Sequence, residues 1–109
     1  MAGVHSIPVG RQDVLLHRGS DERIGIHWLE GGEEKDIHEW ACSLSLSDPN
    51  GGELLSVACE STEDGYAIGH LTAQQTTSLA ATHGKWRIVG EEPDGEEQRL
   101  LGIGGYAME

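Results

Sequence analysis

The clearest structural signal in the chain is the stretch Trp40-Ala41-Cys42-Ser43-Leu44-Ser45-Leu46. Larger or apolar side chains alternate here with small ones. Successive side chains of a β-strand point to opposite faces, so the alternation predicts a strand with one face in the core. That face carries Trp40, Cys42, Leu44 and Leu46. The strand is followed by Asp48-Pro49-Asn50-Gly51-Gly52, which is a strong turn signal.

Weaker signals of the same kind extend in both directions from this strand. Further strands are predicted over residues 13–17, 23–28, 54–59, 66–71, 85–89 and 98–108. Turn residues separate them, at 30–34, 63–65 and 92–96, and the glycines of the last strand predict a bulge or a close backbone contact. About seven short strands with regular turns are typical of a β-sandwich. The sequence therefore predicts an all-β fold, a single β-sandwich that is immunoglobulin-like or similar.

One segment departs from the strand pattern. Thr72 and Gln75 stand three residues apart, as in a capping box at the start of a helix. We therefore predict one short helix over residues 72–79, with Leu79 directed into the core and Gly84 marking its end.

The chain has 109 residues, which is the size of one ordinary domain. Residues 1–12 are predicted to form an extended N-terminal arm, and residues 13–109 the sandwich domain. The chain has no Phe, so we expect a thin core in which Trp28, Trp40 and Trp86 point inward.

Charge limits the classes of partner. Seven basic residues stand against nineteen acidic ones, for a formal net charge of -12. Such a surface repels phosphates and anionic lipids, so we expect neither nucleic acid nor membrane as a partner. The charge serves either solubility or attachment to a basic partner. No apolar run reaches the ~20 residues of a membrane helix, no signal peptide is recognisable, and the two cysteines are too few for a disulfide scaffold. A cytosolic origin is the simplest account.

No catalytic or metal-binding motif emerges from the residue spacing. None of the six histidines has a metal-ligand spacing, no Gly-x-Ser-x-Gly motif occurs, and the paired carboxylates lie in predicted turns where water solvates them. We therefore expect no enzyme activity, no cofactor and no metal. Two alternatives stay open: Cys42 and Cys59 form a cross-strand disulfide or remain free thiols. A weak calcium site would use the fragments Asp48, Asn50, Asp94 and Glu96.

The order of motifs from Leu16 to Ala107 is more informative than any one of them. The first motif in this order is Arg18-Gly19-Ser20-Asp21, and Asp36 and Trp40 follow it. A helical segment then contains Leu71, Thr72, Thr76 and Leu79, and the chain closes with Asp94-Gly95 and Leu100-Leu101-Gly102. This order resembles a class of small β-sandwich structural proteins of tailed bacteriophages, in particular the N-terminal domain of baseplate upper proteins and related short tail proteins. The chain departs from that pattern at Ile37-His38-Glu39, where the class has Leu-Thr-Gly.

The resemblance implies a virion structural protein, associated with the tail or baseplate, that acts by assembly with other virion proteins after synthesis in the host cytoplasm. It also implies a homo-oligomer, as a trimer or ring. Capsid decoration on the head exterior is the close alternative, and a carbohydrate- or peptide-binding sandwich with an exposed Trp is a further one. Candidate assembly contacts are Val4, Ile7 and Val9 of the arm and Tyr106 and Met108 of the last strand.

Overall fold

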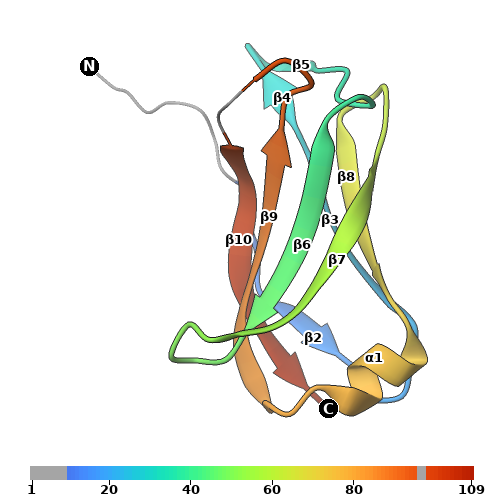
Figure 1. Ribbon diagram of the computed structural model, residues 1–109, viewed down its shortest axis with the longest axis vertical. Helices are drawn as coiled ribbons and strands as arrows, with labels where there is room; N and C mark the ends of the chain where they lie inside the picture. The colour runs from blue at the N-terminus through green and yellow to red at the C-terminus, as the bar shows by residue number, and fades with distance from the viewer. Residues whose placement is uncertain (1–9, 96–97) are drawn as a thin grey trace.

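The computed structural model describes residues 10–95 and 98–109, and it confirms the all-β prediction (Figure 1). One short helix, α1 (Ala73–Ser78), accompanies the strands. The strands are β1 (Gly10–Arg11), β2 (Val14–Leu16), β3 (Glu22–His27), β4 (Leu29–Glu30), β5 (Glu33–Glu34), β6 (Ala41–Ser47), β7 (Glu53–Ser61), β8 (Tyr66–Leu71), β9 (His83–Glu91) and β10 (Gln98–Met108).

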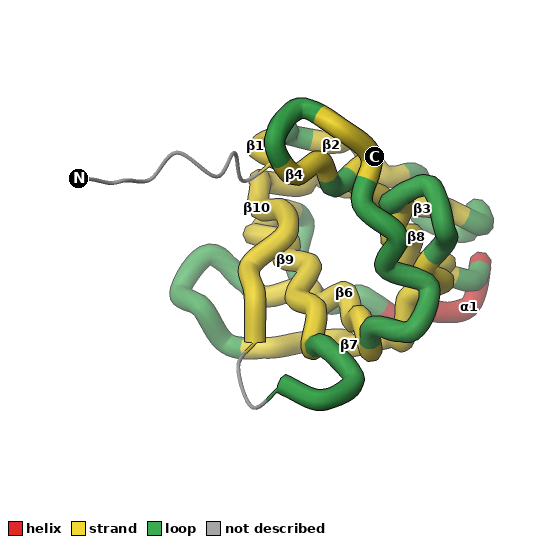
Figure 2. Tube along the Cα trace, turned by 90° about the horizontal axis from the view of Figure 1, so that it is seen from above, coloured by secondary structure: helices red, strands yellow, loops and turns green. Residues whose placement is uncertain are grey.

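The main strands form one hydrogen-bonded path in the order β1-β10-β9-β6-β7-β8-β3, and β2 pairs with β10. Strand β7 joins the two sides of the sandwich. Its first part, up to Ala58, pairs with β6, and its last part, from Cys59, pairs with β8. Seen down the long axis, the strands curl round the core into a nearly closed, barrel-like shape (Figure 2).

Strand β6 behaves as its sequence predicts. Trp40, Cys42, Leu44 and Leu46 are all buried. In register with the neighbouring strand β9, Leu44 lies opposite Ile88, and Leu46 lies opposite Trp86. The inward rows of the two strands therefore coincide, and this alignment fixes the centre of the core.

The remainder of the core comes from β2, β3, β8, β9 and β10 and from a few residues between the elements, and β7 adds half-buried side chains. Trp28, Trp40 and Trp86 are 3 %, 7 % and 2 % exposed, as the strand patterns predict. Ile37 is completely buried in the loop before β6, and no local pattern predicted this burial. Ile37 stands where the phage class has Leu, so the departure from the motif retains an apolar side chain at this position.

The helix begins as predicted and ends earlier. Thr72 is the N-cap, and its hydroxyl accepts a hydrogen bond from the Gln75 amide at 3.1 Å, while the Gln75 side chain accepts one from the Thr72 amide at 2.8 Å. The helix ends at Ser78, with Leu79 buried. The prediction that Gly84 ends the helix was wrong, because Gly84 lies within β9. A side chain there would collide with the Ser47 carbonyl and the Tyr106 ring, so Gly84 serves close strand packing.

Gly10, the first residue that the structure describes, already belongs to the sheet, although the arm was predicted to extend to residue 12. Gly10 and Arg11 pair in parallel with β10, and the Gln12 amide donates to the Ile103 carbonyl at 3.1 Å. Gly104 permits this contact, because any side chain there would meet the Gln12 carbonyl. The predicted bulge of the last strand lies between Leu100 and Gly102. In the part of the chain that the structure describes, no helix is long and apolar enough to cross a membrane.

Candidate functional site

The described residues contain no arrangement typical of catalysis. Thr76 is the one buried polar or charged residue among them, so no buried carboxylate accompanies a histidine. Within residues 10–95 and 98–109, no three His, Cys, Asp or Glu side chains are grouped to hold a metal ion. At the predicted calcium fragment, the Asp48 carboxylate accepts hydrogen bonds from the amides of Asn50 and Gly52, each at 2.9 Å, and so holds its own turn.

The candidate functional site is a surface groove of about 580 Å³ on the outer face of β6, β9 and β10. We call it the outer groove. Its walls and floor include Arg11, Ser45, Ser47, Lys85, Arg87 and Ile103. Gly84, Gly104 and Gly105 also line it.

Strand register explains why these residues come together. Ser45, Arg87 and Ile103 lie opposite one another on three adjacent strands, and Arg11 continues the same row on β1. A second row joins Ser47, Lys85 and Gly105. Side chains two residues apart on a strand share a face, so both rows point outward from the core.

The outer groove gathers positive charge on a strongly acidic chain. Arg11, Lys85 and Arg87 are three of the seven basic residues, and all three are exposed. None of them takes part in the ion pairs formed among the described residues. Two carboxylates also line the groove. Asp13 accepts a hydrogen bond from the Gly105 amide at 2.9 Å, and Glu53 is exposed. The Ser47 hydroxyl donates to the Lys85 carbonyl at 3.3 Å, so the groove offers three cations and the Ser45 hydroxyl to an anionic partner.

A second polar region, which we call the clasp, consists of loop residues 17–22 and α1. Arg18 donates to the carbonyl of Leu79 at 2.6 Å, at the end of the helix, and Asp21 accepts from the amide of Ala73 at 2.7 Å, at its start. A cation at the C-terminus and an anion at the N-terminus both match the helix dipole. The motif Arg18-Gly19-Ser20-Asp21 thus holds the helix in place.

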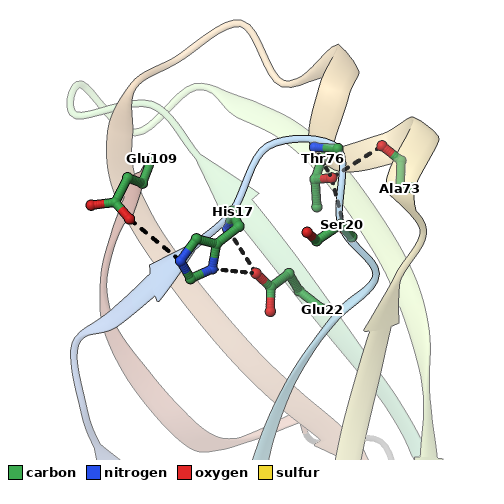
Figure 3. Close-up of polar contacts among 7 residues, drawn as sticks. His17, Ser20, Glu22, Ala73, Thr76 and Glu109 are labelled. Carbon is green, nitrogen blue, oxygen red and sulfur yellow. Dashed lines mark hydrogen bonds and ion pairs between the residues drawn. The ribbon is translucent and has the colours of Figure 1, made fainter.

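Thr76 lies at the centre of the clasp (Figure 3). Its hydroxyl accepts from the Gly19 amide at 3.0 Å and lies within donating distance of the carbonyls of Ser20, at 2.9 Å, and Ala73, at 3.0 Å. The buried hydroxyl therefore has partners for both its donor and its acceptor, as burial of a polar group requires.

His17 closes the other side of the clasp. Figure 3 shows its ring between two carboxylates, Glu22 at 3.1 Å and Glu109 at 3.4 Å. The Glu22 carboxylate also accepts from the His17 amide at 2.7 Å. These contacts join β2, β3 and the last residue of the chain, so the carboxylates around His17 have structural partners.

Exposed carboxylates gather at the opposite end of the strands, in the loops around the β4–β5 hairpin. We call this the acidic end and define it by Glu33, Glu34, Asp36, Glu39, Glu63 and Asp64. The elements are held together there, because Lys35 donates from its amide to the Trp28 carbonyl and Ile37 donates to the Thr62 carbonyl. Two cations, Lys35 and Arg99, bind Glu30 at this end, each at 3.6 Å.

One pair at the acidic end has shifted pKa values. Hydrogen bonds from the His38 amide and ring lower the pKa of Asp36 below its ordinary 3.8. The hydrogen bond to Asp36 raises the pKa of His38 above 6.5, and the nearby Glu39 and Glu63 carboxylates add to this effect. Both side chains are about half exposed, 48 % for His38 and 54 % for Asp36, so the pair contributes local order rather than a buried reactive centre.

The two cysteines are free thiols in the structure. Their strands pair at Ser43 and Ala58, which places Cys42 and Cys59 one step further along the same ladder. Burial raises the pKa of both thiols, that of Cys59 to about 12, and the neighbouring Cys42 adds to the effect at Cys59. Both remain protonated at neutral pH, and a protonated thiol is a poor nucleophile.

The predicted assembly contacts fall into three groups. Val4, Ile7 and Val9 lie outside the described residues. Tyr106 is 3 % exposed, and its hydroxyl donates to the Ser47 carbonyl at 3.1 Å, so its side chain belongs to the core. Burial also raises the pKa of Tyr106. Met108 is half-buried against the core. Their part in assembly stays a prediction, and Tyr106 offers almost no surface for it.

Sequence reasoning missed the outer groove. The alternation of Lys85 and Arg87 around the inward Trp86 was a usable signal, since it places two cations on one outward face. No local pattern pointed to Arg11, because its position depends on the pairing of β1 with β10. In that pairing Arg11 lies opposite Ile103, which is 92 residues further along the chain. A contact between residues so far apart is set by topology alone.

Comparison with known proteins finds a likeness of fold and none of sequence family. The chain matches no protein-family model and no curated protein sequence. Among solved structures it is similar to the N-terminal domain of ORF48 of phage TP901-1, with a TM-score of 0.60 and 11 % sequence identity. The likeness covers 90 % of this chain and 85 % of that chain. The chain thus has the fold of a phage protein domain.

Proposed function

We propose that this chain is a non-enzymatic structural component of a bacteriophage virion that acts by binding other virion proteins, with the tail or baseplate as its place. The observation that carries the proposal is the fold likeness to a phage protein domain over 90 % of the chain. The order of motifs from Leu16 to Ala107 supports the same class independently, because it rests on residues rather than on backbone shape.

The structure clarifies what those motif residues do. Arg18, Asp21 and Thr76 hold the helix in place, and Trp40 and Leu79 are buried in the core. The motif therefore belongs to the fold, and the partner surface must be sought among other residues. A small domain with exposed charge on two separate patches is suited to assembly by surface contact.

The sugar-binding alternative finds no support in the tryptophans. A stacking platform needs an exposed aromatic face, and Trp28, Trp40 and Trp86 are all buried. Tyr66 is 40 % exposed, but its ring is stacked on His27, with 4.2 Å between centroids. We propose further that the chain is made in the host cytoplasm and is located in the virion.

The test is to locate the chain in phage particles. We would delete its gene from the phage or prophage genome that encodes it, examine the particles by electron microscopy, and label wild-type particles with an antibody to the chain. Label at the tail tip, with defective tails in the deletion, is the expected result. Label on the head would favour capsid decoration instead, and particles free of the protein would overturn the virion role.

A further inference from the structure

We infer that the outer groove is the docking site for the acidic end of a second copy of this chain, so that copies associate head to tail. The inference rests on the assembly role proposed above and names one partner for it. It follows from three observations: the unpartnered cations of the groove, the exposed carboxylates of the acidic end, and the position of the two patches on the molecule.

The charges of the two patches are complementary. Arg11, Lys85 and Arg87 lie within two adjacent cross-strand rows and have no carboxylate partner among the described residues. Like charges held close together on one face repel one another, so an anionic partner relieves an existing cost. The strands around the groove bring two carboxylates, Asp13 and Glu53, to its lining, and Asp13 is already engaged by the Gly105 amide.

The acidic end supplies a projection of suitable shape. The β4–β5 hairpin forms a small two-stranded sheet of its own, separate from the main path. Its turn consists of Gly31 and Gly32, both with positive φ, so the tip carries no side chains. Glu33 and Glu34 follow the tip directly and are exposed. Glu34 contacts the His27 ring at 3.0 Å, whereas Glu33 has no ion pair within the described residues.

The two patches cannot meet within one molecule. Asp36 and Glu39 precede the start of β6, whereas Ser45 and Ser47 of the groove lie at its far end. Figure 1 shows the hairpin at the end of the barrel where β6 begins. A contact between different patches on two copies is heterologous, and its repetition gives a closed ring or an open filament, depending on the rotation per copy.

The net charge of -12 sets the conditions under which this contact forms. At low salt, copies repel one another over long distances. At about 0.15 M salt the screening length is about 8 Å, so the overall repulsion fades while contacts at a few ångströms inside the groove persist. At about 1 M salt those contacts weaken as well. Association should therefore pass through a maximum at intermediate ionic strength.

The experiment measures molar mass by light scattering and sedimentation across a series of salt concentrations. Wild-type protein should exceed the monomer mass near 0.15 M salt and return to monomer near 1 M. Arg87→Glu should weaken association by about tenfold or more. Arg23→Glu is the matched control, because Arg23 is an exposed cation on β3, outside the groove, and the change in charge is the same. Circular dichroism would verify that both variants are folded.

A charge exchange identifies the docking partner. The double variant K85E/R87E has an acidic groove, and the double variant E33K/E34K has a basic hairpin. Each alone should be monomeric, and a mixture of the two should associate, because each hairpin then meets a groove of opposite charge. Monomeric wild-type protein at every salt concentration, or equal effects of Arg87→Glu and Arg23→Glu, would overturn the inference. Antibody labelling of particles tests the virion role separately, so the two failures are distinguishable.

Discussion

The clasp and the outer groove both contain charged side chains, but the fold uses those charges in the clasp and leaves them exposed in the groove. In the clasp, Arg18 donates to the Leu79 carbonyl and Asp21 accepts from the Ala73 amide, so both charges are satisfied inside the domain. In the groove, Arg87 and Lys85 point outward from a strand and find no carboxylate among the described residues. The comparison teaches that charge type alone does not identify a binding residue. What distinguishes the two regions is whether the fold already uses the charge.

The difference extends to the hydroxyl groups. Thr76 is completely buried and engages the loop and the helix at once, whereas Ser45 and Ser47 are half-buried at the groove floor. When a buried hydroxyl is removed, its hydrogen-bond partners are left unsatisfied and out of reach of water. When an accessible hydroxyl is removed, water can replace it. Changes in the clasp should therefore reduce stability, and changes in the groove should affect association.

The largest effect is expected at Thr76. Thr76→Val keeps the shape of the side chain but leaves the Gly19 amide without its acceptor. We expect the free energy of unfolding in urea to fall by about 2 kcal/mol. Thr77→Val is the matched control, since Thr77 is exposed and its hydroxyl donates to the Ala73 carbonyl within the helix. Its effect should stay within about 0.5 kcal/mol, and equal losses for both variants would show that the clasp is not held through Thr76.

A smaller effect should separate the arginines. Arg18→Met removes the hydrogen bonds to the helix carbonyls and should lower the free energy of unfolding by about 1 kcal/mol, because the bond is charge-assisted but near solvent. Arg87→Met should change stability by no more than about 0.5 kcal/mol, since it removes no partner and relieves repulsion from Lys85 and Arg11. Urea unfolding measures both variants. A loss at Arg87 as large as that at Arg18 would erase the distinction between the clasp and the groove.

The smallest effect concerns the acidic end, where His38 and Asp36 form an exposed pair. Nuclear magnetic resonance titration of the His38 ring should give a pKa above 6.5, and Asp36→Asn should move it back toward that value. Because the pKa of His38 is raised, its protonation stabilises the fold at pH values below the ordinary pKa of 6.5. This stabilisation is lost as the pH rises through the raised pKa. Because the pKa of Asp36 is lowered, its ionisation stabilises the fold at pH values above 3.8. This stabilisation is lost as the pH falls through the lowered pKa.

Together these directions give a pH window for the pair. The stabilisation from the pair is fully present between about pH 3.8 and pH 6.5. In that range Asp36 is ionised and His38 is protonated in both the folded and the unfolded chain. This stabilisation declines on both sides of that window. The effect on stability is small because water screens both groups. If the pKa of His38 is the same in the wild type and in Asp36→Asn, the contact does not persist in solution.

Local patterns predicted the strands and the start of the helix. The alternation in β6 placed Trp40, Cys42, Leu44 and Leu46 in the core, and the Thr72 and Gln75 side chains formed the predicted capping box. The predicted range of the helix, 72–79, agrees with α1 to within one residue at each end, but the role of Gly84 was misjudged. Gly84 looked like a terminator, but its role is to admit the Ser47 carbonyl and the Tyr106 ring across the sheet.

The sequence by itself determined the all-β class, the inward faces of the strands and the acidic balance, because these follow from side-chain period and composition over a few residues. Tertiary structure alone decided that β7 joins both sides of the sandwich, that Arg18 clasps a helix, and that Arg11 and Arg87 lie in one row on either side of Ile103. Contacts between distant residues depend on strand order and register, which no local pattern encodes. Three scattered cations therefore became one groove only when the sheet had folded.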